Sequence, residues 1–126
     1  MIVVDTSALI AVLLQEKGAK ACHAILLENE IVISAATLTE ALIVAQCRNR
    51  AQELTRMVDD LTFEIVPLTA PASYRAARAY ARWGKGNHPA NLNYGDCFAY
   101  ELAIDRACPL LFIGKDFAKT DVKSAL

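Results

Sequence analysis

The sequence predicts an α/β fold with a mainly parallel sheet that helices cover on both faces. Short apolar runs alternate with longer segments of helical periodicity along the 126 residues. The hydrophobic content of 55% is enough to bury the core of one domain of this length. Strands that alternate with helices are joined by right-handed crossovers, and such crossovers make neighbouring strands parallel.

Four apolar runs predict the strands, and the last three are mostly β-branched or aromatic. The predicted strands are residues 2–4, 31–33, 63–66 and 110–113. A weaker run near Val122 would add one more strand. We therefore expect a sheet of four to five strands.

Helical periodicity fills the segments between the strands. The predicted helices are residues 7–14, 17–28, 36–48, 51–61, 70–83 and 94–107. Residues 84–91 contain glycines, asparagines and a proline, which predicts a surface loop. Neither a change of composition nor an internal repeat divides the sequence, so we expect a single domain over residues 1–126.

The composition excludes several classes of protein. A charged content of 21% beside the high hydrophobic content excludes a disordered linker. The net charge of −1 means that any surface for a polyanion must be local. The four cysteines show no CxxC spacing, so we expect reduced thiols in a cytoplasmic protein. No apolar run approaches the roughly 20 residues of a membrane helix, and the strand-like opening is unlike a signal peptide.

Four acidic residues stand at the start of an element or just after an apolar run. They are Asp5, Glu40, Asp96 and Asp116. In a doubly wound sheet the carboxyl ends of the strands and the starts of the helices share one rim, where ligands bind. We therefore expect these four side chains to converge, although they are far apart in the sequence.

Each acid also has a structural interpretation. Asp5 could cap the helix that starts near Ser7, and Asp116 could close a turn. Glu40 ends a Thr-Leu-Thr-Glu run that matches a capping box, and Asp96 stands in the same relation to Asn93. The structural and functional interpretations are compatible, because capping positions lie on the ligand-binding rim.

A cluster of carboxylates requires a cation or protonation. Two unit charges about 4 Å apart cost roughly 4 kcal/mol at an effective dielectric constant near 20. Oxygen ligands favour Mg²⁺ or Mn²⁺ over zinc, and Mg²⁺ usually takes one or two carboxylates together with waters and substrate phosphates. Thr6 and Ser7 follow Asp5 and could ligate a metal, hold a water or bind a phosphate oxygen. These features indicate chemistry on phosphate esters.

A stripe of basic residues is a candidate surface for a polyanion. It comprises Arg75, Arg78, Arg82 and Lys85, which recur along one side of a predicted helix. Such cations suit a phosphate backbone, but a charged outer stripe is also normal for a solvated helix. The functional interpretation requires the stripe to lie near the acidic rim.

Other catalytic motifs are absent from the sequence. His23 and His88 have no partner at ligand spacing, and no GxSxG segment accompanies a serine. The sequence also contains neither GxxxxGK[ST] nor GxGxxG. These absences argue against a serine hydrolase and against the common nucleotide-binding loops.

In combination, four segments resemble the PIN-domain ribonucleases, and specifically the VapC toxins of type II toxin–antitoxin systems. They are VVDTSAL at 3–9, TE at 39–40, LNYGDCFAY at 92–100 and LFIGKDF at 111–117. The Asn-Tyr-Gly-Asp start of an apolar helix and the later Gly-Lys-Asp-Phe are specific when they occur together. The resemblance extends over essentially the whole chain.

The resemblance implies a three-layer α/β/α fold and a Mg²⁺-dependent endoribonuclease. The family's acidic positions fall on Asp5, Glu40, Asp96 and Asp116. Asp5 and Asp96 would be the principal metal ligands, and the other two would complete the site directly or through water. Asp121 is an alternative to Asp116 as the fourth acid. The family also implies a homodimer that a cognate VapB-type antitoxin inhibits.

Two other classes of function remain open on the sequence. A receiver-like signalling module also has acids at the rim of a parallel sheet, Mg²⁺ and a late lysine such as Lys115. It needs a phosphate-accepting aspartate after its middle strand, whereas here Ser34 and Pro67 follow the candidate strands. The other class is a binding protein that keeps the fold without catalysis.

Overall fold

The computed structural model describes residues 1–126 and contains a four-stranded sheet in the order β3-β2-β1-β4. The strands are β1 (Ile2–Val4), β2 (Ile31–Ser34), β3 (Glu64–Val66) and β4 (Leu110–Leu111). All three strand pairings are parallel. Val3 of β1 pairs with Val32 on one side and Leu110 on the other, so β1 lies in the interior of the sheet.

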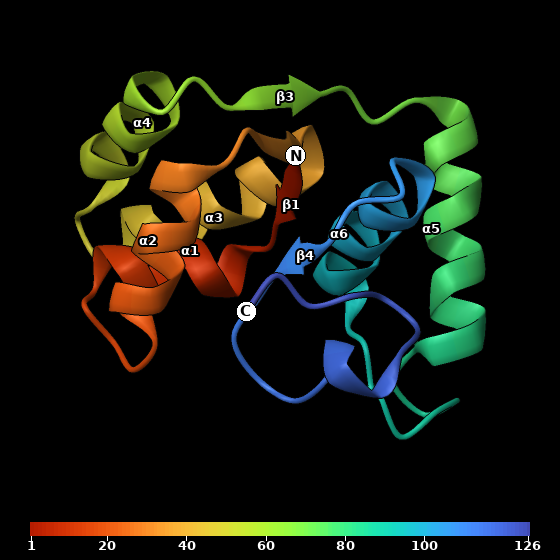
Figure 1. Cartoon of the computed structure of the whole chain (residues 1–126). Coiled ribbons are helices and arrows are strands. Elements are labelled where there is room, and N and C mark those ends of the chain that lie inside the picture. The colour runs from red at the N-terminus through yellow and green to blue at the C-terminus, as the bar shows by residue number, and fades with distance from the viewer.

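Helices cover both faces of the sheet, as the alternation of elements predicts. The α-helices are α1 (Thr6–Leu13), α2 (Ala19–Glu28), α3 (Ala35–Cys47), α4 (Ala51–Asp60), α5 (Ala70–Trp83) and α6 (Tyr94–Asp105). Figure 1 shows α1 to α4 on one side of the sheet and α5 and α6 on the other. A short 3₁₀ helix, η1 (Phe117–Lys119), follows β4. The fold is therefore the three-layer α/β/α arrangement.

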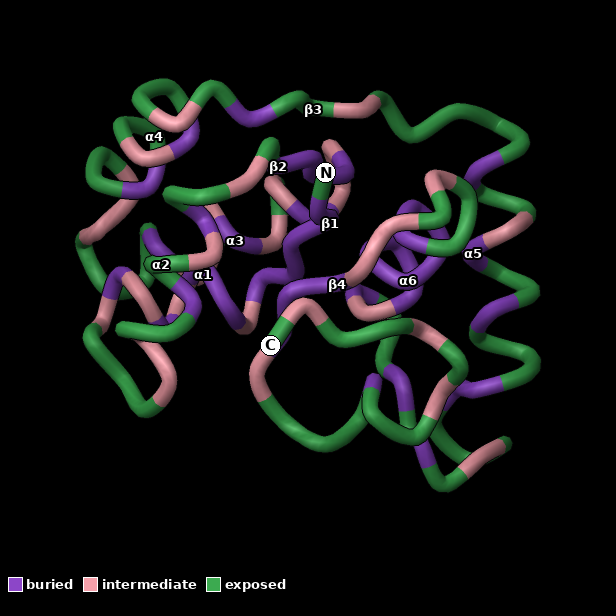
Figure 2. The backbone as a smooth tube through the Cα atoms, viewed as in Figure 1, coloured by how far each residue is buried: buried purple, intermediate pink, exposed green.

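The side chains of β1 divide between two hydrophobic cores. Val3 belongs to the core that contains residues of α5 and α6, whereas Ile2 and Val4 belong to the core under α1 to α4. This division follows from the two-residue period of a strand. Figure 2 shows the resulting buried backbone in the middle of the molecule, around β1 and β4. Both faces of the strand are buried, which explains its uniformly apolar sequence.

The predicted elements are present, and most differences lie at their ends. β4 covers two residues instead of four. The segment near Val122 is not a strand: an isolated parallel bridge joins Leu110 to Ser124. The prediction of a fifth strand was therefore wrong, and that of four strands is confirmed. None of the helices combines the length and the apolar composition that a membrane-spanning helix requires.

The sheet order separates the chain from receiver-like modules. In the doubly wound order 2-1-3-4-5 the first strand lies between the second and the third. Here β1 lies between β2 and β4, and β3 lies outside β2. The receiver-like interpretation of the sequence is therefore not supported by the topology.

Candidate functional site

A cleft of about 450 Å³ lies where β1 and β4 end and α6 begins. We call it the acidic cleft, and its lining includes Asp5, Ser7, Asn93, Asp96, Lys115 and Asp116. Three of the four predicted acids thus come together from segments far apart in the sequence. The convergence follows from the parallel sheet, whose carboxyl edge is shared by successive strands.

The side chain of Asp5 is held by the first turn of α1, the helix that it caps. Its Oδ2 accepts hydrogen bonds from the Ser7 amide at 3.0 Å and from the Ser7 hydroxyl at 2.6 Å. Its Oδ1 is buried without any hydrogen-bond partner. Burial raises the pKa of Asp5, the hydrogen bonds from Ser7 lower it, and the charge of Glu40 raises it further. A buried, unpartnered carboxylate oxygen is the kind of atom that a hard cation satisfies.

Ser7 joins the ends of two strands. Its hydroxyl donates to Asp5 and accepts from the amide of Ile113, just beyond β4, at 3.0 Å. Because its hydroxyl makes both hydrogen bonds, Ser7 fixes the orientation of Asp5 and the path of the chain after β4. The sequence suggested Ser7 as a polar group but gave no indication of the bond to Ile113.

Asp96 forms a reciprocal capping box with Asn93 at the start of α6, as the sequence predicted. The backbone N–H of Asp96 donates to Asn93 Oδ1 at 2.9 Å, and the backbone N–H of Asn93 donates to Asp96 Oδ2 at 3.0 Å. Burial is the largest cause that raises the pKa of Asp96 from its usual 3.8 to about 6. The charges of Asp5, Glu40 and Asp116 act in the same direction, which places all four acids in one electrostatic neighbourhood.

Glu40 reaches the same neighbourhood from α3. The predicted capping box that ends at Glu40 was wrong, because α3 begins at Ala35 and its cap is Ser34, whose hydroxyl accepts from Ala36. Glu40 therefore lies in the second turn of α3. Its carboxylate packs against Gly95, the residue before Asp96. Glu40 is thus beside the acidic cleft and is not part of its lining.

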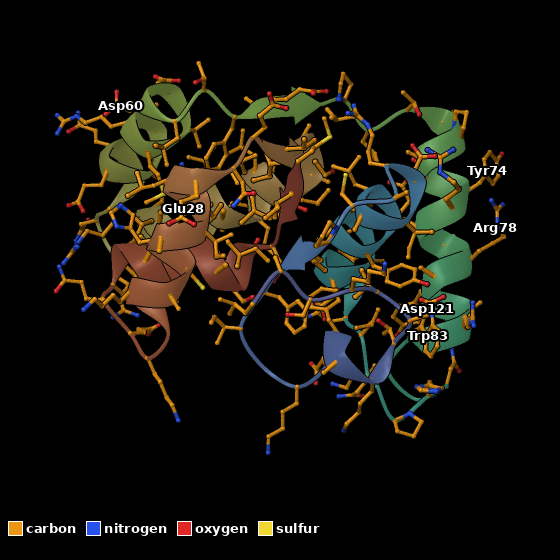
Figure 3. All side chains as sticks on the ribbon, in the orientation of Figure 1. Glu28, Asp60, Tyr74, Arg78, Trp83 and Asp121 are labelled. Carbon is orange, nitrogen blue, oxygen red and sulfur yellow. The ribbon has the colours of Figure 1, made fainter.

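The two alternatives for the fourth acid occupy different places. Asp116 lines the acidic cleft in the turn after Gly114, whose φ is +112°. Asp121 instead accepts a hydrogen bond of 2.6 Å from the Tyr100 hydroxyl and lies 3.7 Å from Arg82. Figure 3 shows Asp121 beside Trp83 at the end of α5. Of the two acids, only Asp116 lines the acidic cleft.

Tyr100 connects Asp121 to Trp83. Its hydroxyl accepts from the indole Nε1 of Trp83 at 2.9 Å while it donates to Asp121. Arg82 stacks over the Trp83 ring with 4.3 Å to the centroid. These contacts fasten the C-terminal segment to α5 and α6. The sequence contained no signal for them, because the spacing of Trp83, Tyr100 and Asp121 matches no local motif.

Arg75, Arg78 and Arg82 of the predicted basic stripe lie on α5 but line a different cleft, between α5 and α6. The fourth member, Lys85, lies beyond the end of α5 and does not line this cleft. Arg75 is held by Glu101 at 2.7 Å and lies 3.7 Å from Asp105. Arg78 makes no ion pair and lies on the outward side of α5 in Figure 3. Periodicity predicted the shared helix side correctly, but the acids of α6 that face Arg75 could not be placed from the sequence.

Thr6 is turned away from the acidic cleft. It is buried, and its hydroxyl donates to the carbonyl of Thr37 in α3 at 3.3 Å. This bond ties α1 to α3. Thr6 therefore does not line the acidic cleft in which Ser7 takes part.

The acids do not form a closed metal cage. No group of three or more His, Cys, Asp or Glu side chains has a geometry that would hold a metal ion. An open oxygen site with one or two carboxylates fits Mg²⁺, which keeps waters and takes substrate phosphate oxygens. The unpartnered Asp5 Oδ1 and the raised pKa of Asp96 fit such a cation.

Comparisons with known proteins show the family and the fold of the chain. A family profile described as PIN domain matches residues 2–123. The chain is 42% identical to a protein named VapC ribonuclease Mb0625 from Mycobacterium bovis, over 98% of this chain and 97% of the relative. It resembles the structure of VapC20 from Mycobacterium tuberculosis, a toxin described as cleaving the sarcin–ricin loop, with a TM-score of 0.78 at 15% identity over 97% and 96% of the two chains. A toxin–antitoxin complex from Klebsiella pneumoniae matches with a TM-score of 0.72 at 22% identity over 96% and 93%.

Proposed function

Because the chain belongs to the PIN-domain family, with full-length relatives named VapC ribonucleases, we propose that it is a metal-dependent endoribonuclease of the VapC type. It hydrolyses RNA phosphodiester bonds in the acidic cleft. The observation that carries the proposal is the convergence of Asp5, Asp96 and Asp116 on one cleft in which a buried carboxylate oxygen has no partner.

The metal is Mg²⁺, with Mn²⁺ as the alternative, because the acids that line the cleft, Asp5, Asp96 and Asp116, offer oxygen ligands and the lining contains no His or Cys. Asp5 and Asp96 would be its principal ligands, and Asp116 and Glu40 would complete the site directly or through water. When bound, the cation supplies an activated water and neutralises charge on the phosphate oxygens. These assignments are supported by the unpartnered Asp5 Oδ1 and by the raised pKa of Asp96.

The chain's own residues orient the reacting groups. Ser7 holds one oxygen of Asp5 and leaves the other free. The backbone N–H of Asn93 donates to Oδ2 of Asp96, which fixes the carboxylate at the helix start. Lys115 is the cation in the lining, and its ammonium group pairs with a phosphodiester oxygen of the substrate.

The arginines of α5 line a different cleft from the acids, so the condition that they lie near the acidic rim is not met, and their contact with RNA stays a prediction. Arg78 is the best placed of them, because no acid neutralises it. Arg75 and Arg82 pair with acids and contribute less. The low net charge of the chain agrees with a local basic surface.

The partners are a VapB-type antitoxin and a second copy of the chain. The antitoxin is supported by the likeness to the Klebsiella pneumoniae complex. Several large apolar side chains are exposed on the isolated chain, among them Ile43 at 55% and Tyr94 at 78%. Exposed apolar surface of this kind is common where proteins associate.

The experiment is an RNA cleavage assay with purified protein in Mg²⁺ and in EDTA. We expect cleavage in Mg²⁺, no cleavage in EDTA and none with Asp96→Asn. Asp121→Asn is the matched control, because it makes the same change of one acid outside the cleft and should still cleave. Cleavage by a well-purified Asp96→Asn protein, or equal cleavage in EDTA, would reject the proposal.

A further inference from the structure

Four of the five glycines have a backbone reason to be glycine. Three of them take positive φ angles, namely Gly18, Gly86 and Gly114. A Cβ atom on Gly84 would collide with the carbonyl oxygen of Tyr80. The left-handed region and close approach to backbone are the usual causes for a glycine.

Gly95 has neither of these causes. It lies in the first turn of α6, and its φ is not in the left-handed region. Alanine at a compatible helical position normally stabilises a protein, because it restricts the unfolded chain. Glycine at this place therefore costs stability without a benefit to the backbone.

The space beside Gly95 is filled by one side chain. The three atoms nearest to an added Cβ all belong to the carboxylate of Glu40, with Cδ at 2.7 Å and Oε1 at 2.9 Å. Such distances do not occur for real Cβ atoms, so Glu40 and a side chain at position 95 exclude each other. The first turn of a helix also favours a carboxylate through its dipole.

We propose that Gly95 is a positioning residue whose missing side chain admits the Glu40 carboxylate from α3 to the edge of the acidic cleft, beside Asp96. The consequence for metal binding rests on the proposed function, but the steric coupling of Gly95 to Glu40 does not. Glu40 lies close enough for its charge to act on both Asp5 and Asp96.

The conflict falls on a flexible side chain and not on the backbone. The Glu40 side chain is only partly buried, and it makes no ion pair that would hold it rigidly. An alanine at position 95 therefore moves the carboxylate aside and leaves the fold intact. Gly95→Ala should resemble the loss of Glu40 at the site while the chain remains folded.

The first test measures metal affinity in a double-mutant cycle. The proteins are the wild type, Gly95→Ala, Glu40→Ala and the double variant, titrated with Mn²⁺ while the free ion is followed by electron paramagnetic resonance. We expect Gly95→Ala to weaken binding by about 10-fold in the presence of Glu40, as for lost outer-sphere support. It should cause no further weakening in the Glu40→Ala background. An unchanged affinity, or equal weakening in both backgrounds, would overturn the proposal.

The second test needs neither metal nor RNA. Thermal unfolding of the same proteins in EDTA should show Gly95→Ala raising the melting temperature by about 1 to 4 °C in the Glu40→Ala background. With Glu40 present the gain should vanish or reverse. Glu28→Ala, on the distant end of α2, is the control background and should behave like the wild type. Equal shifts in all backgrounds would contradict the coupling.

The two tests separate failure of this inference from failure of the proposed function. A wild-type protein that neither binds Mn²⁺ nor cleaves RNA would reject the nuclease. Coupling between Gly95 and Glu40 in metal-free unfolding would still be measurable in that case. Absence of coupling in a wild type that binds metal and cleaves RNA would reject only the role of Gly95.

Discussion

The Ser7 hydroxyl donates to Asp5 Oδ2 at 2.6 Å, and the other oxygen of that carboxylate is left buried and unpartnered. The same hydroxyl accepts from the amide of Ile113. One side chain thus sets both the orientation of an acid and the relation between the ends of β1 and β4. Its removal should affect the site and the fold together.

Ser7→Ala should lower RNA cleavage and metal affinity by about 10- to 100-fold, because Asp5 loses its orienting partner. The loss of two hydrogen bonds should also reduce the free energy of unfolding by about 1 to 3 kcal/mol. Cleavage kinetics and chemical denaturation measure the two effects. Ser73→Ala removes an exposed hydroxyl on α5 and is the matched control. Equal behaviour of the two variants would refute the role of Ser7.

Asp96→Asn should abolish cleavage and leave α6 capped. The substituted side chain keeps an oxygen that can accept from the backbone N–H of Asn93, so the capping box survives while the charge is lost. Circular dichroism and thermal unfolding should match the wild type, whereas cleavage should not be detectable. A variant that fails to fold would show that this acid is needed for the structure first.

The metal-free protein should become more stable as the pH falls from 7 towards 5. Asp96 has a folded-state pKa of about 6, above its usual 3.8, so the folded state takes up a proton before the unfolded state does. Burial raises the pKa of Asp5 as well, which adds to the same trend. The contribution of Asp96 is therefore lost as the pH rises between about 4 and 6. Melting temperatures in EDTA should show a weaker pH dependence for Asp96→Asn, and identical profiles would contradict the shift.

Asp116→Asn and Asp121→Asn should differ sharply in their rates of RNA cleavage. Asp116 lines the acidic cleft, so its substitution should strongly reduce cleavage. Asp121 accepts from Tyr100, and an asparagine oxygen can still accept that bond, so cleavage should persist. Initial rates on one RNA substrate decide the matter. The reverse order of activities would assign the fourth acid to Asp121.

Tyr100→Phe should loosen the segment that carries Asp116. The buried hydroxyl bonds both Trp83 and Asp121, and its removal leaves the indole donor without a partner, which costs about 1 to 3 kcal/mol. Hydrogen exchange should increase in residues 114–126, with a smaller loss of cleavage than for Asp116→Asn. Tyr74→Phe is the control, because Tyr74 is 70% exposed.

The repeating pattern of apolar residues was sufficient to predict the layers and most of the helices. The convergence of Asp5, Asp96 and Asp116 could be predicted as well, because a parallel sheet brings the ends of its strands to one edge. The cap of α3 could not, although the predicted start of the helix differs from the observed start by only one residue. Ser34 both ends β2 and caps α3, without any linker, so the polar run at Thr37 resembled a helix start although it lies inside one.

Long-range partners of side chains were the other limit of the sequence. Asp116 and Asp121 lie five positions apart in an irregular segment, where no period indicates direction. The Tyr100 hydroxyl of α6 and Arg82 of α5 distinguish their places, because both contact Asp121. The pairing of Arg75 with Glu101 depends in the same way on how α5 packs against α6.

The Asp96 carboxylate has two roles. It forms the capping box with Asn93 at the start of α6, and it lines the acidic cleft. Adding or deleting one residue between Asn93 and Asp96 would turn the acid by about 100° around the helix axis. The three-residue spacing is therefore as strict a requirement as the identity of the acid. Length variation among homologous chains should consequently be tolerated in residues 84–91 and forbidden in this one turn.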